Sequence, residues 1–238
     1  MASGLIGRLQ RLQRCSAMGV KPTRRSTRAT RRLLLIVIAI LVPAGLAAHP
    51  HAWIDLRVKL ILDDQQRIEG LAQTWVFDPV YTMILMEELD EEHAGAERPQ
   101  QLAELGERLI GNMAEYDYLT NVEHGDNRIR AAGVEAIEVR LDESEQLEFR
   151  FTLALPEAVD TREEPLHYMI YDPVYYIEML HGSPAAISHN GGSTCSVEIT
   201  EPDPDPSQIA RAAAVDIGAA TADGLGKHFA ERVSIRCR

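Results

Sequence analysis

Cysteine and aromatic residues are scarce in this sequence. Its 238 residues include three cysteines, four phenylalanines and two tryptophans. We find no nucleophile elbow, phosphate loop, Cys-x-x-Cys pair or nucleotide-binding fingerprint, and no partner pattern around the serines and threonines. The sequence therefore lacks the motifs of the common hydrolase, NTPase, thiol-redox and dinucleotide classes, and the shortage of aromatic surface argues against polysaccharide binding.

Acidic residues are absent from the first 48 positions, which carry nine Arg and Lys residues. This basic segment runs into an apolar stretch over 33–42 and then into small residues that end at Ala48. A basic start, a short apolar run and small residues at the cut are the parts of a secretory signal. We therefore predict that 1–48 is removed and that the mature chain starts at His49. An uncleaved anchor is the alternative, but the apolar run is shorter than the roughly 20 residues of a membrane-spanning helix, which argues against it.

Removal of the leader leaves a strongly acidic chain. Nine of the 24 basic residues leave with it, whereas all 36 acidic residues stay, so 15 cations face 36 carboxylates and the formal net charge is −21. Such a chain repels nucleic acid and anionic membrane surfaces. We expect a periplasmic protein without nucleic-acid partners and without stable membrane insertion after cleavage. A start at Met18 and a twin-arginine route through Arg31 and Arg32 stay open.

Two cysteines remain after cleavage, because Cys15 belongs to the leader. In an oxidising compartment an even pair predicts a disulfide, here between Cys195 and Cys237. A two-thiol metal site is the alternative.

Hydrophobic periodicity predicts a β-rich chain with a few helices. Period-two alternation predicts strands, which cover 51–60, 67–77, 134–141, 146–155, 166–171, 185–189, 195–200 and 232–237. Near-helical spacing and capping signals predict helices over 80–92, 99–116 and 208–219. We expect an α+β fold with antiparallel sheets in a sandwich-like arrangement and two or three helices. Residues 49–238 would form one domain, with 49–125 and 126–238 as candidate internal halves.

A five-residue segment occurs twice in nearly the same form. FDPVY at 77–81 returns as YDPVY at 171–175, each time after a predicted strand. The repeat indicates either two related β units or merely two strands that leave a sheet through Asp-Pro. Asp78 and Asp172 are candidate cleft carboxylates for acid–base or metal chemistry, and turn formation is the structural alternative.

The strongest candidate for chemistry is His49-Pro50-His51. Residues two apart on a strand share a face, so two imidazoles can converge on one metal ion, and Asp55 lies on the same face. Cleavage would add the α-amine of His49, which is available as a free base near neutral pH. Nitrogen ligands favour zinc, nickel or copper over calcium or magnesium. Solvated histidines without a ligand are the alternative.

Two further histidines could fold back toward this terminus. His167 lies on a predicted strand that leads to Asp172, and His124 lies in a predicted loop. Each could equally be an ordinary surface histidine.

Four motifs in order carry a resemblance to a known family. They are HPHAW at 49–53, WVFD at 75–78, YDYLT at 116–120 and YDPVYY at 171–176. Together they resemble the bacterial domain-of-unknown-function 1007 family over essentially the whole mature chain. The resemblance implies a periplasmic component associated with ABC-type or nickel/cobalt-type metal transport systems.

These observations give one leading hypothesis and two alternatives. We expect a non-enzymatic accessory protein that binds zinc, nickel or copper through His49 and His51. Its partner would be an inner-membrane metal transporter or another periplasmic protein. One alternative is a copper oxidoreductase that uses an N-terminal histidine chelate. The other is a structural or assembly partner without a ligand.

Overall fold

The computed structural model describes residues 50–93, 95–190, 194–214 and 224–238. The predicted leader 1–48 and His49 lie outside these residues. Residues from Ala47 to Arg238 form one compact unit. Within the described ranges, no helix is long and apolar enough to span a membrane.

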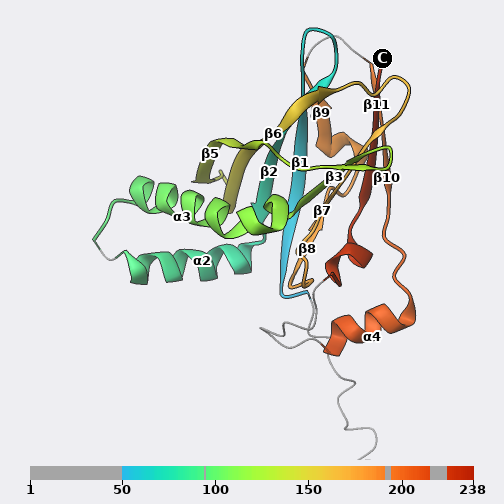
Figure 1. The fold of residues 1–238 in the computed structure, drawn as a ribbon. Coiled ribbons are helices and arrows are strands. Elements are labelled where there is room, and N and C mark those ends of the chain that lie inside the picture. The colour runs from blue at the N-terminus through green and yellow to red at the C-terminus, as the bar shows by residue number, and fades with distance from the viewer. Residues whose placement is uncertain (1–49, 94, 191–193, 215–223) are drawn as a thin grey trace, which may run out of the picture. The chain divides into compact units, whose positions relative to one another are not determined.

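The larger sheet is built around its longest central strands (Figure 1). Its order is β5-β6-β2-β1-β8, and β9 also pairs with β1. The strands are β1 (Ala52–Leu62), β2 (Ile68–Phe77), β5 (Gly133–Leu141), β6 (Leu147–Val159), β8 (Ile177–Leu180) and β9 (Ile187–His189). β1 runs antiparallel to β2 but parallel to β8 and β9. This sheet is therefore mixed, which corrects the expectation of purely antiparallel sheets.

The smaller sheet is antiparallel throughout, with the order β10-β11-β7-β3-β4. Its strands are β3 (Thr120–His124), β4 (Asn127–Ile129), β7 (Leu166–Ile170), β10 (Cys195–Thr200) and β11 (Arg232–Cys237). Each of the two sheets takes strands from both candidate halves, 49–125 and 126–238.

Three α-helices complete the α+β fold, as expected. They are α2 (Pro79–Glu92), α3 (Arg98–Met113) and α4 (Pro206–Ala214). Short 3-10 turns follow α3 (η1, Ala114–Leu119), precede β9 (η2, Pro184–Ala186) and precede β11 (η4, Gly226–Phe229). The last five residues of the helix predicted over 208–219 lie outside the described residues.

One hydrophobic core joins both sheets and α3. Alternate residues of β1, from Ile54 to Leu60, are buried against it, as the period-two pattern predicts. Trp75 meets the rings of Phe149 and Phe151 edge-on, at centroid distances of 5.8 and 5.3 Å. α3 packs close to β5 at Gly106, where a Cβ would lie 3.1 Å from the side chain of Ile137.

The predicted disulfide is confirmed. Cys195 and Cys237 are opposite each other at the ends of β10 and β11, and their sulfurs are bonded.

Candidate functional site

The chain enters β1 between two Asp-Pro turns. On one side, the Trp53 amide donates to a carboxylate oxygen of Asp78 at 3.0 Å, and the Asp78 amide donates to the Trp53 carbonyl at 3.0 Å. On the other side, the His51 amide donates to the Tyr176 carbonyl at 2.9 Å, five residues after Tyr171. The repeated segments FDPVY and YDPVY, 94 positions apart in sequence, thus flank the same end of one strand.

Asp78 fixes the start of α2. Its Oδ1 accepts hydrogen bonds from the amides of Val80 and Tyr81, both at 2.9 Å, and Pro79 occupies the first turn. A side-chain oxygen at this position satisfies amides that have no partner within the helix. With Oδ2 bound to Trp53, both carboxylate oxygens accept backbone hydrogen bonds.

Asp172 does the same for the turn that leads into β8. Its Oδ1 accepts from the amide of Val174 at 3.1 Å, and its Oδ2 accepts from the amides of Tyr176 and Ile177 at 2.7 and 3.1 Å. Asp78 and Asp172, the two candidate cleft carboxylates, thus both accept backbone hydrogen bonds in the described structure, as the turn-forming alternative predicts.

His51 is exposed at the start of β1. Its ring packs against the ring of Tyr176, with a centroid distance of 4.9 Å. Asp55 shares the exposed face of β1 but lies four residues further on, which is about 13 Å along an extended strand. That separation is too long for His51 and Asp55 to bind one ion together.

His124 and His167 lie on the other sheet. The His124 ring lies 3.2 Å from the carbonyl oxygen of Glu164. The Nδ1 atom of His167 is buried and has no hydrogen-bond partner among the described residues. Burial, followed by the charge of Arg232, lowers the pKa of His167 below its ordinary 6.5. His124 on β3 and His167 on β7 belong to the smaller sheet, whereas His51 precedes β1 of the larger sheet.

Among residues outside the masked segments, no group of three or more His, Cys, Asp and Glu side chains could hold a metal ion. The described chain thus contributes one exposed imidazole, that of His51, to the predicted metal site. His49 lies outside the described residues.

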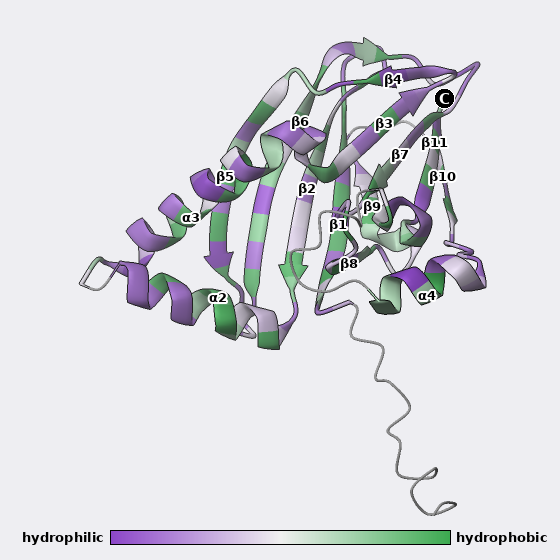
Figure 2. Ribbon diagram, turned by 60° about the horizontal axis from the view of Figure 1, so that its bottom comes forward, coloured by the Kyte–Doolittle hydropathy of each residue, from purple (hydrophilic) through white to green (hydrophobic). Residues whose placement is uncertain are grey.

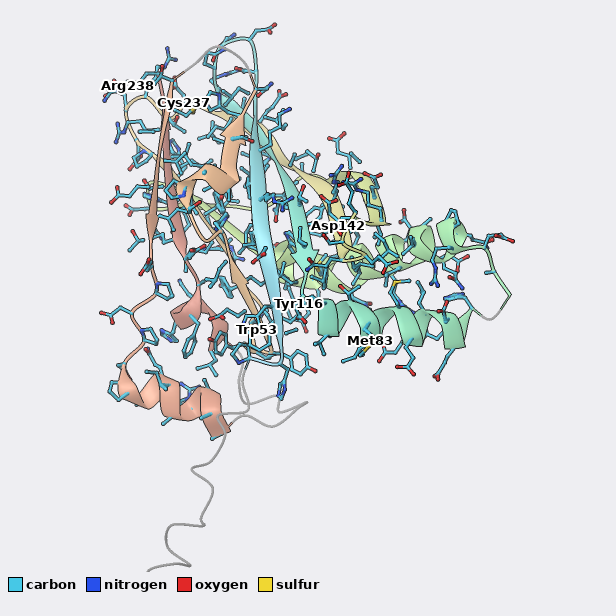
Figure 3. The ribbon with its side chains drawn as sticks, turned by 180° about the vertical axis from the view of Figure 1, so that it is seen from behind. Trp53, Met83, Tyr116, Asp142, Cys237 and Arg238 are labelled. Carbon is cyan, nitrogen blue, oxygen red and sulfur yellow. A yellow bond between two sulfur atoms is a disulfide. The ribbon has the colours of Figure 1, made fainter. Side chains whose placement is uncertain are left out.

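An exposed apolar surface at this end of the molecule was not predicted from the sequence. We call it the apolar surface; it consists of Trp53 on β1 with Val80, Met83 and Ile84 on α2, whose exposed fractions run from 41% to 64%. Figure 2 shows the hydrophobic segments of α2, and Figure 3 labels Trp53 and Met83. The signal was available: residues 80–86 are apolar except Thr82, and a single helix cannot turn so broad an apolar band entirely toward the core.

The pKa of Tyr81 depends on groups from both turns. Burial raises its pKa above the ordinary 10.0, and Tyr176 and the carboxylates of Glu88, Asp172 and Asp78 raise it further. Its hydroxyl therefore stays protonated and neutral at physiological pH.

The chain is similar to known proteins over most of its length. An uncharacterized protein of Haemophilus influenzae is 23% identical over 211 residues, which cover 85% of this chain and 97% of that protein. Residues 34–237 match the family described as "Protein of unknown function (DUF1007)". The chain belongs to this family.

Proposed function

We propose that the mature protein is a periplasmic accessory protein that binds zinc, nickel or copper at its N-terminal end and serves a metal transport system. The observation that carries the proposal is the position of His51. Its backbone is tied to Tyr176 and its ring is exposed at the edge of the folded unit. A ligand held in this way is preorganised, and an ion bound there is accessible to a partner protein.

The proposed ligand set is small and consists of nitrogen atoms. The described residues supply the imidazole of His51, and cleavage after Ala48 would supply the α-amine and imidazole of His49. Asp55 is left out because it lies too far along β1 from His51, and His124 and His167 are left out because their strands belong to the other sheet. Such a set favours copper, nickel or zinc, and it exists only if the chain begins at residue 49.

The experiment compares four proteins in calorimetric titrations with zinc, nickel and copper. They are the chain starting at His49, the same chain with one extra N-terminal residue, His51→Gln, and His124→Gln as the control on the other sheet. We expect the extra residue and His51→Gln each to weaken binding about tenfold or more, and His124→Gln to bind as the parent. Failure of the His49 form to bind any of the three metals would refute the proposal.

The copper-loaded His49 form is also assayed for redox activity. Reductant-dependent peroxide formation by the copper-loaded His49 form would indicate the copper oxidoreductase. Absence of peroxide would favour binding without catalysis.

A second candidate function, that of an assembly protein without a metal, is favoured by the apolar surface. The second half of α2 is acidic, with Glu87, Glu88 and Asp90 exposed next to this surface. The matching partner would present an apolar patch with a basic rim. In the host, this function would survive deletion of 49–51 but not Met83→Asp, whereas Ile209→Asp, at an exposed apolar residue of α4, would be harmless. If the protein instead acts by binding metal, deletion of 49–51 should abolish its function in the host.

A further inference from the structure

A cavity of about 260 Å³ lies between η1 and the segment that follows β7. It is separate from the proposed metal ligands. The 116–120 motif, which the proposed function does not use, and the start of the 171–176 motif contribute to its walls. The lining side chains with polar or aromatic groups include Glu115, Tyr116, Asp117, Arg128, Arg130 and Tyr171.

Backbone strain is concentrated on one wall of this cavity. Asp117, Tyr118 and Leu119 are consecutive and none is glycine, yet their φ angles are +49°, +56° and +56°. Each such residue costs on the order of 1–3 kcal/mol and persists only where the surroundings hold it. Strain of this kind collects at ligand-binding sites, where it fixes side chains in a required position.

Several contacts hold the strained turn in place. The Thr120 hydroxyl donates to the Tyr118 carbonyl at 3.0 Å, and the Tyr171 amide donates to the Leu119 carbonyl at 3.0 Å. Arg128 donates to the Asp117 carboxylate at 2.6 Å. The turn is therefore rigidly connected to β3, β4 and β7.

The charges around the cavity are balanced, in contrast to the acidic molecule as a whole. Arg128 and Asp117 pair with each other, whereas the Arg130 Nε lies 4.0 Å from Asp117 and its side chain is 76% exposed. Glu115 is exposed and forms no ion pair within the described ranges. One guanidinium thus keeps spare donors, and one carboxylate lacks a cationic partner.

A guanidinium with spare donors and an exposed carboxylate at one cavity favour one class of ligand. A simple anion would be attracted by Arg130 but repelled by Glu115. A simple cation would be attracted by Glu115 but repelled by Arg130. A zwitterion satisfies both groups, because a guanidinium binds a carboxylate in a two-point arrangement and a carboxylate accepts from an ammonium group.

The size of the cavity narrows the class further. At about 260 Å³ the cavity lies just below the roughly 300–1,000 Å³ of common small-molecule sites, so it suits a small ligand such as an amino acid. We propose that this cavity binds a free α-amino acid, with its carboxylate at Arg130, its ammonium group at Glu115 and its side chain along Tyr116 and Tyr171.

The experiment is a calorimetric titration of metal-free protein covering residues 49–238. The probes are leucine, serine, aspartate and lysine, with isocaproate and isoamylamine as analogues of leucine that lack the ammonium and the carboxylate. We expect saturable binding of at least one amino acid, and no binding of isocaproate or isoamylamine.

Variants connect this binding to the cavity. Arg130→Gln should weaken it about ten- to a hundredfold, Arg130→Lys should restore part of the loss, and Glu115→Gln should weaken it similarly. Arg57→Gln, an exposed cation on the outer face of β1, should bind as the parent and serves as the matched control. Three results would overturn the proposal: no saturation by any of the four amino acids, parental affinity in Arg130→Gln, or isocaproate binding as tightly as leucine.

Discussion

At the residue scale, Gly226 determines how closely η4 approaches the Asp172 turn. A Cβ at this position would lie 1.8 Å from the carbonyl oxygen of Asp172, and the Gly226 amide donates to the Pro173 carbonyl at 3.1 Å. Beside it, the rings of Tyr175 and Phe229 are stacked at 3.9 Å. The turn that supports the start of β1 therefore depends on a residue without a side chain.

Gly226→Ala should destabilise the protein by about 1–3 kcal/mol or more, because backbone atoms must move to admit the methyl group. Urea unfolding followed by tryptophan fluorescence measures the loss. Gly111→Ala in α3 is the control, since nothing lies within 4 Å of its added Cβ and a helix-interior alanine is favourable by up to about 1 kcal/mol. Equal effects of the two substitutions would contradict the close approach.

The Glu148 carboxylate makes the stability of the protein depend on pH in the acidic range. Burial acts to raise its pKa, but hydrogen bonds from Arg150 and Arg140 outweigh burial and lower the pKa below the ordinary 4.5. The unfolded chain therefore binds a proton first as the pH falls, and the stability due to this carboxylate is present above pH 4.5 and lost below it.

We expect Glu148→Gln to cost about 1–3 kcal/mol near neutral pH and to flatten the fall in unfolding free energy below pH 4.5. Urea titrations at a series of pH values measure both effects. Glu143→Gln, an exposed change in the hairpin turn before β6, is the control. An unchanged slope in Glu148→Gln would show that this carboxylate has the same pKa in both states.

The sequence allowed prediction of the face on which a residue lies, but not of its neighbours across strands. Parity placed Asp55 on the exposed face of β1, which the structure shows. Whether His124 and His167 approach His51 depends on which sheet each strand joins, and pairings between distant segments leave no local trace in the sequence.

At the scale of elements, local sequence patterns were enough to predict much of the secondary structure. β10 and β11 have their predicted bounds, and β2 differs from its prediction by one residue. β3, β4 and β8 were not predicted, because they are short and β3 carries Thr120, Asn121 and Glu123 in a central position. The parallel pairing of β8 and β9 with β1 was missed for a different reason: it joins segments far apart in sequence.

A buried polar network ties β7 to the ends of β8 and η4. The Tyr168 hydroxyl lies 2.9 Å from His181 Nε2, and His181 Nδ1 lies 2.7 Å from Glu231 Oε2. Donation by Nδ1–H to the carboxylate leaves Nε2 to accept from the tyrosine. Because the network is buried, each member depends on the others for its hydrogen bonds.

Tyr168→Phe should cost about 1–3 kcal/mol by leaving the His181 nitrogen without its partner, and Glu231→Gln should cost a similar amount. A double-mutant cycle by urea unfolding is the measurement. We expect a coupling energy of at least about 0.5 kcal/mol. Additive effects would mean that the three side chains act independently.

At the scale of the whole molecule, the dominant feature is charge. The form that begins at residue 49 carries 36 carboxylates against 15 cations. The arginines with carboxylate partners include Arg67, Arg98, Arg108 and Arg232. The pairs of Arg98 and Arg108 are exposed on both sides, where an ion pair contributes little. Repulsion among the remaining carboxylates destabilises the compact state.

Moderate salt should therefore raise the unfolding free energy of this form. Going from about 10 mM to about 150 mM NaCl shortens the screening length from about 30 Å to about 8 Å and weakens the repulsion. Thermal unfolding at neutral pH measures the change. A melting temperature that falls with salt would show that ion pairs, and not net repulsion, dominate the electrostatics.

The pairing of β1 with β8 also affects the order in which the larger sheet can form. Ala52 of β1 pairs with Ile177 of β8, which lies 125 positions later in the sequence, and pairings between such distant segments form slowly. β2 can cover one edge of β1 early, but the other edge must wait with its backbone groups unpaired. Asp55, Arg57 and Lys59 point outward along β1, and such charges hinder the association of one unfolded chain with another while this edge is open.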